Sequence, residues 1–173
     1  MGNRRGSIGG GAAASLILGV LAVWPPSATA APQGAGTPAA QAFLTENAKA
    51  DGVVALPGLQ YKILKSGPAD GQHPTRADDI TVRYVGRLLD GKVFNTSLDN
   101  GAGTTVFPLQ KLIPGWIAAL PLMRPGDVWE LYLPSYLAYG AAGKSYIPPD
   151  STLVFRVELV AVAPHVEPPA PAK

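Results

Sequence analysis

The side chains in this sequence that could take part in chemistry are aromatic and aliphatic rather than nucleophilic. They gather in three stretches, which run from Tyr84 to Ser97, from Ile113 to Trp116 and from Leu137 to Gly140. Each stretch places a large apolar side chain where a strand is expected to end or a helix to begin. Such a pocket offers almost no acid–base chemistry, so it suits a reaction that needs neither a nucleophile nor proton transfer.

The residues that most catalytic classes require are missing from the sequence. There is no cysteine, which excludes thiol nucleophiles, thiolate metal sites and disulfides. The two histidines, His73 and His165, have no ligand partner at strand or helix spacing, and we interpret both as solvated. Asp78 and Asp79 precede an expected strand and are interpreted as solvated turn residues. Hydrolase, kinase and redox functions lack their motifs, and neither a metal nor a cofactor is expected.

Residues 1–30 have the pattern of an export signal. Arg4 and Arg5 give a positive start, the apolar run 12–24 follows, and Ala28-Thr-Ala30 offers a small-x-small cleavage site. The apolar run is short for a membrane span, and a retained anchor is the alternative interpretation. Export predicts a location in the bacterial cell envelope, in the periplasm of a Gram-negative cell.

Cleavage after Ala30 would make the remaining chain formally neutral. It would leave 143 of the 173 residues, and loss of Arg4 and Arg5 would reduce Lys+Arg from 14 to 12, equal to the 12 Asp+Glu. A neutral surface gives no electrostatic reason to bind nucleic acid or an anionic membrane. The remaining length fits one domain with its own core.

Alternation of apolar and polar residues predicts that most of this domain is made of strands. The pattern holds in four segments, which are residues 59–65, 80–85, 128–133 and 152–160. The Asp90-Gly91 pair predicts a tight turn between strands.

Two segments favour a helix instead. Residues 39–50 form the first, with Thr37 as its expected cap. The second runs over residues 115–123, where Pro121 should end or bend it near Leu120. The pattern predicts an α+β fold in which an antiparallel sheet curls around one short helix.

Composition divides the remainder of the chain. Residues 31–38 are interpreted as a disordered linker, and 39–57 as the short N-terminal helix and its connection. The folded domain is expected over 58–163, and residues 164–173 form a proline-rich tail.

The chain closely resembles the FKBP-type peptidyl-prolyl cis–trans isomerases. Four motifs carry the resemblance in order: Val82-x-Tyr-x-Gly-x-Leu-x-Asp-Gly-x-x-Phe94, Ile113-Pro-Gly-Trp116, Ala138-Tyr-Gly140 and Ile147-Pro-Pro149 leading to Phe155. The similarity runs from about Gly58 to Val162. It implies an FKBP-like half-open antiparallel sheet wrapped around the short helix, with a pocket between them.

The resemblance also implies roles for individual side chains. By matching position, Trp116 would form the floor of the pocket. The rim and walls would be formed by Tyr84, Phe94, Phe155, Leu112, Ile113, Tyr146 and Ile147. The backbone N–H of Ile113 and the hydroxyl of Tyr139 would hold substrate carbonyls. Proline-containing clients are the implied partners, and a macrolide is a further candidate ligand. The long dimerising helix of the macrophage-infectivity-potentiator type is not seen upstream, which implies a monomer.

The sequence departs from the family pattern at charged positions. Asn95 follows the motif phenylalanine where aspartate is usual, and it is retained as a catalytic candidate. Asn100 stands about where the family often has a partner arginine, and Thr105 roughly where a phenylalanine wall can occur. Because the aspartate and its partner arginine are both replaced by asparagine, no charge is left without a partner. The fold should therefore tolerate the two replacements.

Rotation about a prolyl bond fits a pocket of this kind. Twisting a peptide bond out of plane costs roughly 18–20 kcal/mol because amide resonance is lost. The twisted amide has less charge separation than the planar one, so an apolar site can favour it by differential binding. The competing hypothesis is a weakly active or inactive binding module, or a holdase, that captures unfolded segments in the same pocket.

Overall fold

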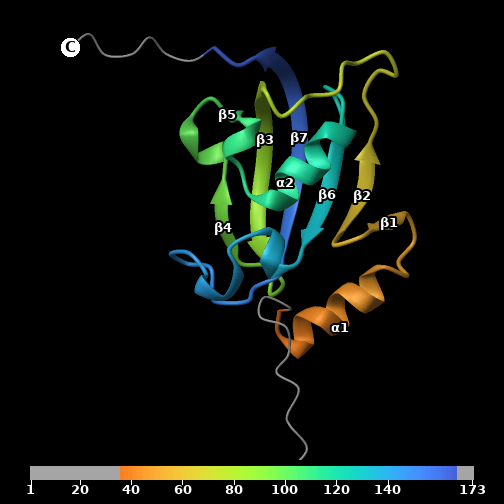
Figure 1. Ribbon diagram of the computed structural model, residues 1–173, viewed down its shortest axis with the longest axis vertical. Coiled ribbons are helices and arrows are strands. Elements are labelled where there is room, and N and C mark those ends of the chain that lie inside the picture. Colours follow the sequence, from red (N-terminus) through yellow and green to blue (C-terminus); the bar gives the residue numbers. More distant parts are fainter. Residues whose placement is uncertain (1–35, 167–173) are drawn as a thin grey trace, which may run out of the picture.

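One antiparallel sheet dominates the computed structural model, which describes residues 36–166 (Figure 1). Its strands are β1 (Val53–Leu56), β2 (Leu59–Lys65), β3 (Asp78–Leu88), β4 (Val93–Thr96), β5 (Thr105–Pro108), β6 (Val128–Leu133) and β7 (Leu153–Pro164). The order across the sheet is β1-β2-β6-β7-β3-β4, and β5 pairs with the first half of β3. All of these pairings are antiparallel. The expected half-open sheet is therefore confirmed.

Helix α2 (Pro114–Ala119) lies across one face of this sheet, in front of β6 and β7 in Figure 1. The chain continues as a single 3₁₀ turn over Leu120–Leu122, because Pro121 cannot supply the N–H that an α-helix needs there. The predicted bend near Leu120 is confirmed. The helical segment buries Trp116, Ala119, Leu120 and Met123 against strand residues that include Val82, Leu131, Leu133, Phe155 and Val157.

The strands that the sequence predicts are present, and three others are added. β2 and β6 have the predicted bounds, β3 extends beyond its predicted bounds at both ends, and β7 extends beyond them at its C-terminal end. β1, β4 and β5 are four residues each, too short to show alternation. The Asp90-Gly91 turn joins β3 to β4, with Gly91 at φ 86° and its N–H donating to Leu88 O at 3.0 Å.

Helix α1 (Pro38–Asn47) packs against the base of the sheet rather than fraying. Thr37 caps it as predicted, since its hydroxyl accepts from the Ala40 N–H at 3.2 Å. The ring of Phe43 lies 6.1 Å from that of Tyr132. The side chain of Gln60 donates to Leu44 O at 2.7 Å, which ties the helix to β2.

His73 is exposed as predicted, although its ring is hydrogen-bonded, whereas His165 is partly buried beside Asp79, so the interpretation of His165 as solvated was wrong. His73 Nδ1 lies 3.0 Å from Met123 O, and its Nε2 accepts from Arg124 Nε at 3.0 Å. His165 Nδ1 lies 2.7 Å from Asp79 Oδ1, so Asp79 is not a free turn residue either. The end of β7 and His165 are bound to the start of β3, and the expected tail begins later than residue 164.

Asp78 is the remaining residue of that pair, and it opens β3. Its carboxylate accepts from the backbone N–H of Thr75 and from the Thr75 hydroxyl. These hydrogen bonds lower the pKa of Asp78, and the one from the backbone has the larger effect.

The predicted export signal lies outside the described residues. Within residues 36–166 no helix has the length and apolarity to cross a membrane.

The turn after α2 is held by a buried carboxylate. Asp127 accepts from the Gly67 N–H at 2.5 Å and from the Arg124 N–H at 2.8 Å. Gly67 follows β2 and Arg124 follows the helical segment, so one side chain fixes both connections. Without the Asp127 carboxylate, the backbone N–H groups of Gly67 and Arg124 would each lose a charge-assisted hydrogen bond.

Replacing Asp127 with alanine should lower the free energy of unfolding by about 2–5 kcal/mol, because two backbone donors lose an ionised acceptor. Chemical denaturation measures the change. Asp99→Ala is the matched control, since Asp99 is exposed and should shift the value by less than about 0.5 kcal/mol. Equal stability of the Asp127 and Asp99 variants would contradict this account of the turn.

Candidate functional site

The indole of Trp116 is the centre of an aromatic cluster between α2 and the sheet. It is 3% exposed. The rings of Tyr84, Phe155 and Phe107 meet it nearly at right angles, with centroids at 5.3, 5.4 and 6.4 Å respectively. These rings come from β3, β7 and β5, so packing by strands far apart in the sequence fixes the orientation of the indole.

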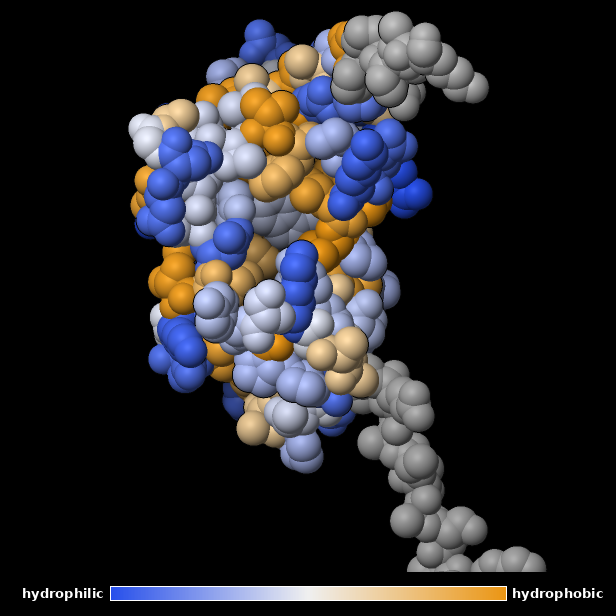
Figure 2. Space-filling view, turned by 90° about the vertical axis from the view of Figure 1, so that its left-hand side faces the viewer, coloured by the Kyte–Doolittle hydropathy of each residue, from blue (hydrophilic) through white to orange (hydrophobic). Residues whose placement is uncertain are grey.

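A cavity of about 550 Å³ opens over this cluster, and we call it the central cavity. It is lined by Tyr84, Asn95, Phe107, Lys111, Leu112, Ile113, Trp116, Tyr139, Lys144 and Phe155. Figure 2 shows this side of the molecule hollowed near its middle, with a pale floor and both hydrophobic and hydrophilic side chains around it. Seven of the ten predicted site residues lie here.

A second cavity of about 280 Å³ adjoins the first, and we call it the outer cavity. It shares Asn95, Tyr139 and Lys144 with the central cavity, and its other lining residues are Phe94, Ser145, Tyr146 and Ile147. The three remaining predicted residues, Phe94, Tyr146 and Ile147, therefore border the outer cavity. Phe94 also meets Phe155 edge-on at 5.6 Å.

Two groups at the central cavity have hydrogen-bonding capacity to spare. Within residues 36–166, nothing accepts a bond from the Ile113 N–H. The Tyr139 hydroxyl has no partner among the same residues. Both groups can donate to a carbonyl oxygen, and both belong to segments that border the cavity.

Asn95 and Asn100, the two asparagines at which the sequence departs from the expected charged residues, make different hydrogen bonds. Tyr84 Oη donates to Asn95 Oδ1, which places the amide between the two cavities. Asn100 donates to Thr104 O at 2.7 Å and to Thr105 Oγ1 at 2.8 Å, so it ties its own loop together. Thr105, the first residue of β5, therefore binds Asn100 through its hydroxyl. The aromatic residue that β5 contributes to the cavity wall is Phe107.

The Tyr84 hydroxyl stays neutral over the ordinary pH range. Burial is the larger cause of the raised pKa of Tyr84, and the neighbouring Tyr139 is the smaller. A raised pKa means that ionisation is delayed to more alkaline pH. The hydroxyl therefore remains a donor to Asn95 at neutral and moderately alkaline pH.

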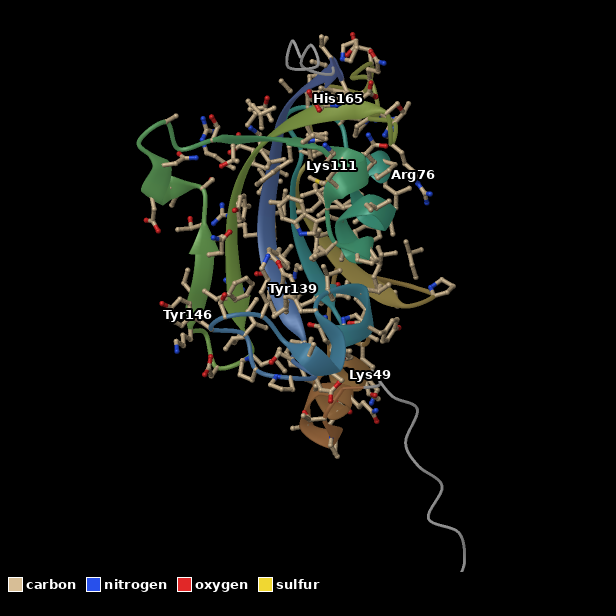
Figure 3. All side chains as sticks on the ribbon, turned by 60° about the vertical axis from the view of Figure 1, so that its left-hand side comes forward. Lys49, Arg76, Lys111, Tyr139, Tyr146 and His165 are labelled. Carbon is tan, nitrogen blue, oxygen red and sulfur yellow. The ribbon has the colours of Figure 1, made fainter. Side chains whose placement is uncertain are left out.

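Sequence reasoning missed four lining residues, Phe107, Lys111, Lys144 and Ser145. Phe107 was visible as an aromatic residue, but β5 is too short for its inward face to be recognised. The lysines carried no motif. Lys111 precedes α2 and Lys144 follows Tyr139, and only the fold brings these two segments to the same cavity. Lys111 and Tyr139 are labelled in Figure 3.

Comparison with known proteins identifies the family. Residues 70–160 match the family described as FKBP-type peptidyl-prolyl cis-trans isomerase. The chain belongs to this family. It is 48% identical over 124 residues to the peptidyl-prolyl cis-trans isomerase Mip of Coxiella burnetii, covering 70% of this chain and 53% of that protein. With the 22 kDa FKBP-type isomerase of Escherichia coli K12 it shares 47% identity over 122 residues, covering 69% and 58%.

Solved structures agree with the assignment. FkpA from Escherichia coli matches with a TM-score of 0.69 and 39% identity, over 73% of this chain and 58% of that chain. A peptidyl-prolyl cis-trans isomerase from Pseudomonas syringae pv. tomato matches with a TM-score of 0.66 and 38% identity, over 72% and 91%. The family and fold inferred from the motifs are confirmed. The chain spans about half the length of the curated relatives it matches.

Gly86 on β3 is the residue that lets two aromatic rings of the site meet. A Cβ atom at this position would lie 2.7 Å from Phe94 Cζ and 2.8 Å from Phe155 Cε1. Real carbon atoms do not approach so closely without displacement. The glycine of this family motif therefore makes room for the wall of the site, which no other residue type allows.

Gly86→Ala should lower the free energy of unfolding by about 1–3 kcal/mol, because the added methyl overpacks the ring pair. Differential scanning calorimetry or denaturation measures it. Adding Phe94→Leu to this variant should recover part of the loss, since a smaller side chain relieves the contact. A Gly86→Ala protein as stable as the parent would show that the rings do not constrain this strand.

Proposed function

We propose that this protein is a peptidyl-prolyl cis–trans isomerase that accelerates rotation about X–Pro bonds in exported proteins. The observation that supports it best is the buried indole of Trp116 at the floor of the central cavity, enclosed by the rings of Tyr84, Phe107 and Phe155. A prolyl ring is compact, rigid and without an N–H, so it can be buried against aromatic faces without leaving a donor unpaired.

The proposed mechanism is differential binding of the twisted amide. An unassisted X–Pro bond isomerises in roughly tens to hundreds of seconds. The apolar cavity favours the twisted state, in which the carbonyl and nitrogen carry less opposite charge than in the planar amide. A thousandfold acceleration needs roughly 4 kcal/mol of such preference.

Individual residues would bind and orient the substrate without exchanging protons. The Ile113 N–H and the Tyr139 hydroxyl would donate to substrate carbonyls on either side of the prolyl ring. Asn95, held by the Tyr84 hydroxyl, would contribute a neutral dipole beside the rotating bond. Leu112 and Ile147 would close the apolar rim.

The remaining assignments are proposals of the same kind. Residues 1–30 would direct export to the periplasm, 31–38 would link them to the domain, and the catalytic unit would span 58–163. A monomer is supported by α1, whose Phe43 packs on Tyr132 of its own chain. A macrolide would compete with prolyl substrates for the central cavity.

Trp116→Leu should reduce kcat/KM for a proline peptide by at least about tenfold, because the aromatic floor under the prolyl ring is lost. Trp129→Leu is the matched control. Trp129 is about as buried, at 4% exposure, but it does not line the cavity. Its ring stacks on that of Tyr61, with the two centroids 4.4 Å apart.

Both tryptophan variants should be destabilised, and only Trp116→Leu should lose activity while folded. Equal activity of the two folded variants would overturn the assignment of the site. Negligible turnover by the unaltered protein, with suppression of client aggregation that persists when the cavity is blocked, would favour the holdase instead.

The activity should be independent of pH from about pH 5 to 9, because no group with a pKa in that range takes part. The raised pKa of Tyr84 keeps its hydroxyl protonated throughout, and any loss should appear only as the pH rises beyond the usual tyrosine range. Initial rates across this range measure the profile. A bell-shaped curve would reveal a titrating catalytic group.

A further inference from the structure

The charged side chains that line the two cavities are both lysines. Lys111 borders the central cavity, and Lys144 borders both cavities. In the described part of the chain, no carboxylate lies within 4.0 Å of either ammonium group. The mouth of the site therefore carries two ammonium groups that have no ion-pair partner within residues 36–166.

The loop that carries Lys144 is held by hydrogen bonds. Lys144 N donates to Ile147 O at 3.0 Å and Ile147 N donates to Lys144 O at 2.8 Å. Gly143 precedes them at φ 64°, where a Cβ atom would lie 2.4 Å from Ile147 O. The ammonium lies 5.2 Å from the centroid of the Tyr139 ring, a cation–π contact that holds it beside the cavity wall.

Asn95 adds hydrogen-bond donors to this charge. Because its Oδ1 accepts from the Tyr84 hydroxyl, the amide presents its N–H groups rather than its oxygen to other ligands. A residue with N–H donors beside an ammonium group complements a carboxylate. An aspartate at this position would instead repel one.

The two cavities can be occupied by neighbouring residues of one peptide. They share Asn95, Tyr139 and Lys144, so a side chain adjacent to a proline in the central cavity can reach the outer cavity. In Figure 3, Tyr139 lies between Lys111 and Tyr146, which mark the two ends of this surface. Tyr146 is 76% exposed and open to a ligand.

We propose that the outer cavity selects an acidic side chain next to the proline of the client, and that Lys144 determines this preference. The inference rests on the proposed isomerase function, since it requires a proline in the central cavity. It makes clients with Glu or Asp beside proline better substrates than otherwise identical clients with Gln or Lys there. The neutral Asn95 contributes to this preference, because it does not repel the client's carboxylate from Lys144.

The effect should be modest and salt-dependent. An exposed ion pair contributes roughly 0.2–1 kcal/mol, which corresponds to about a 1.4- to fivefold preference. Screening at high salt should remove most of it, because both charges remain in contact with water.

Peptides that differ only in Glu, Gln or Lys immediately before or immediately after one proline test the inference. At low salt, kcat/KM should be about two- to fivefold higher for Glu than for Gln in at least one of the two positions, and lowest for Lys. At roughly 0.5 M salt the three values should converge.

Three variants assign the preference to its residues. Lys144→Gln should bring the Glu-to-Gln ratio close to one, and Lys144→Glu should invert it. Asn95→Asp should reduce the ratio by adding a negative charge at the same place. Lys65→Gln is the control: it removes an exposed lysine from the end of β2, far across the sheet from β4, and should leave the ratio unchanged.

A ratio of one in the unaltered protein, or an unchanged ratio in folded Lys144→Gln, would overturn this inference while leaving the isomerase function intact. Absence of turnover with every peptide would instead reject the isomerase function. In that case NMR titration with the Glu and Gln peptides decides the question. Equal dissociation constants reject the acidic preference, and tighter Glu binding that depends on Lys144 supports it.

Discussion

Three aromatic rings from three different strands meet the indole of Trp116, and this packing is the constraint on which the site depends. The rings hold the indole at the floor of the cavity only while α2 lies across the sheet and β5 pairs with β3. Each edge-to-face pair contributes about 0.5–1.5 kcal/mol beyond the apolar area it buries. The packing that stabilises the fold is therefore also the surface that a prolyl ring would contact.

The rest of the architecture keeps this contact in place. Pro121 ends the helix after Ala119, so the chain turns back toward the sheet, and Asp127 fixes that turn to the end of β2. Gly86 leaves space for Phe94 against Phe155. A cavity with walls fixed in this way has its apolar surface organised before substrate binds, so little ordering cost remains.

The sequence predicted the parts of this structure that have a local cause. Alternation located β2, β3, β6 and β7, and proline chemistry located the end of α2. The family motifs supplied seven of the ten predicted residues, and the other three, Asn95, Leu112 and Tyr146, are immediate neighbours of motif residues; all ten border the two cavities. Long-range contacts were not predictable: His165 binds Asp79 across 86 residues of sequence, and Lys111 and Lys144 meet at one opening only because of the fold. Short strands such as β5 lack the length for a periodic signal, which is why Phe107 was missed.

The described side chains that line the two cavities include amide and ammonium groups but no carboxylate, which gives the site a positive character. Asn95 is satisfied by Tyr84 and Asn100 by its own loop, so neither requires a counter-charge. The two lysines then determine the sign of the potential at the mouth. Under the two proposals, bond rotation would depend on the aromatic floor, and the choice of client would depend on the charged rim.

NMR exchange spectroscopy of a proline peptide with the protein tests the central claim most directly. The account predicts cis–trans exchange peaks that appear only when protein is present, together with nuclear Overhauser contacts between the prolyl ring protons and the Trp116 indole. Accelerated exchange with contacts to some other surface, and none to Trp116, would contradict it.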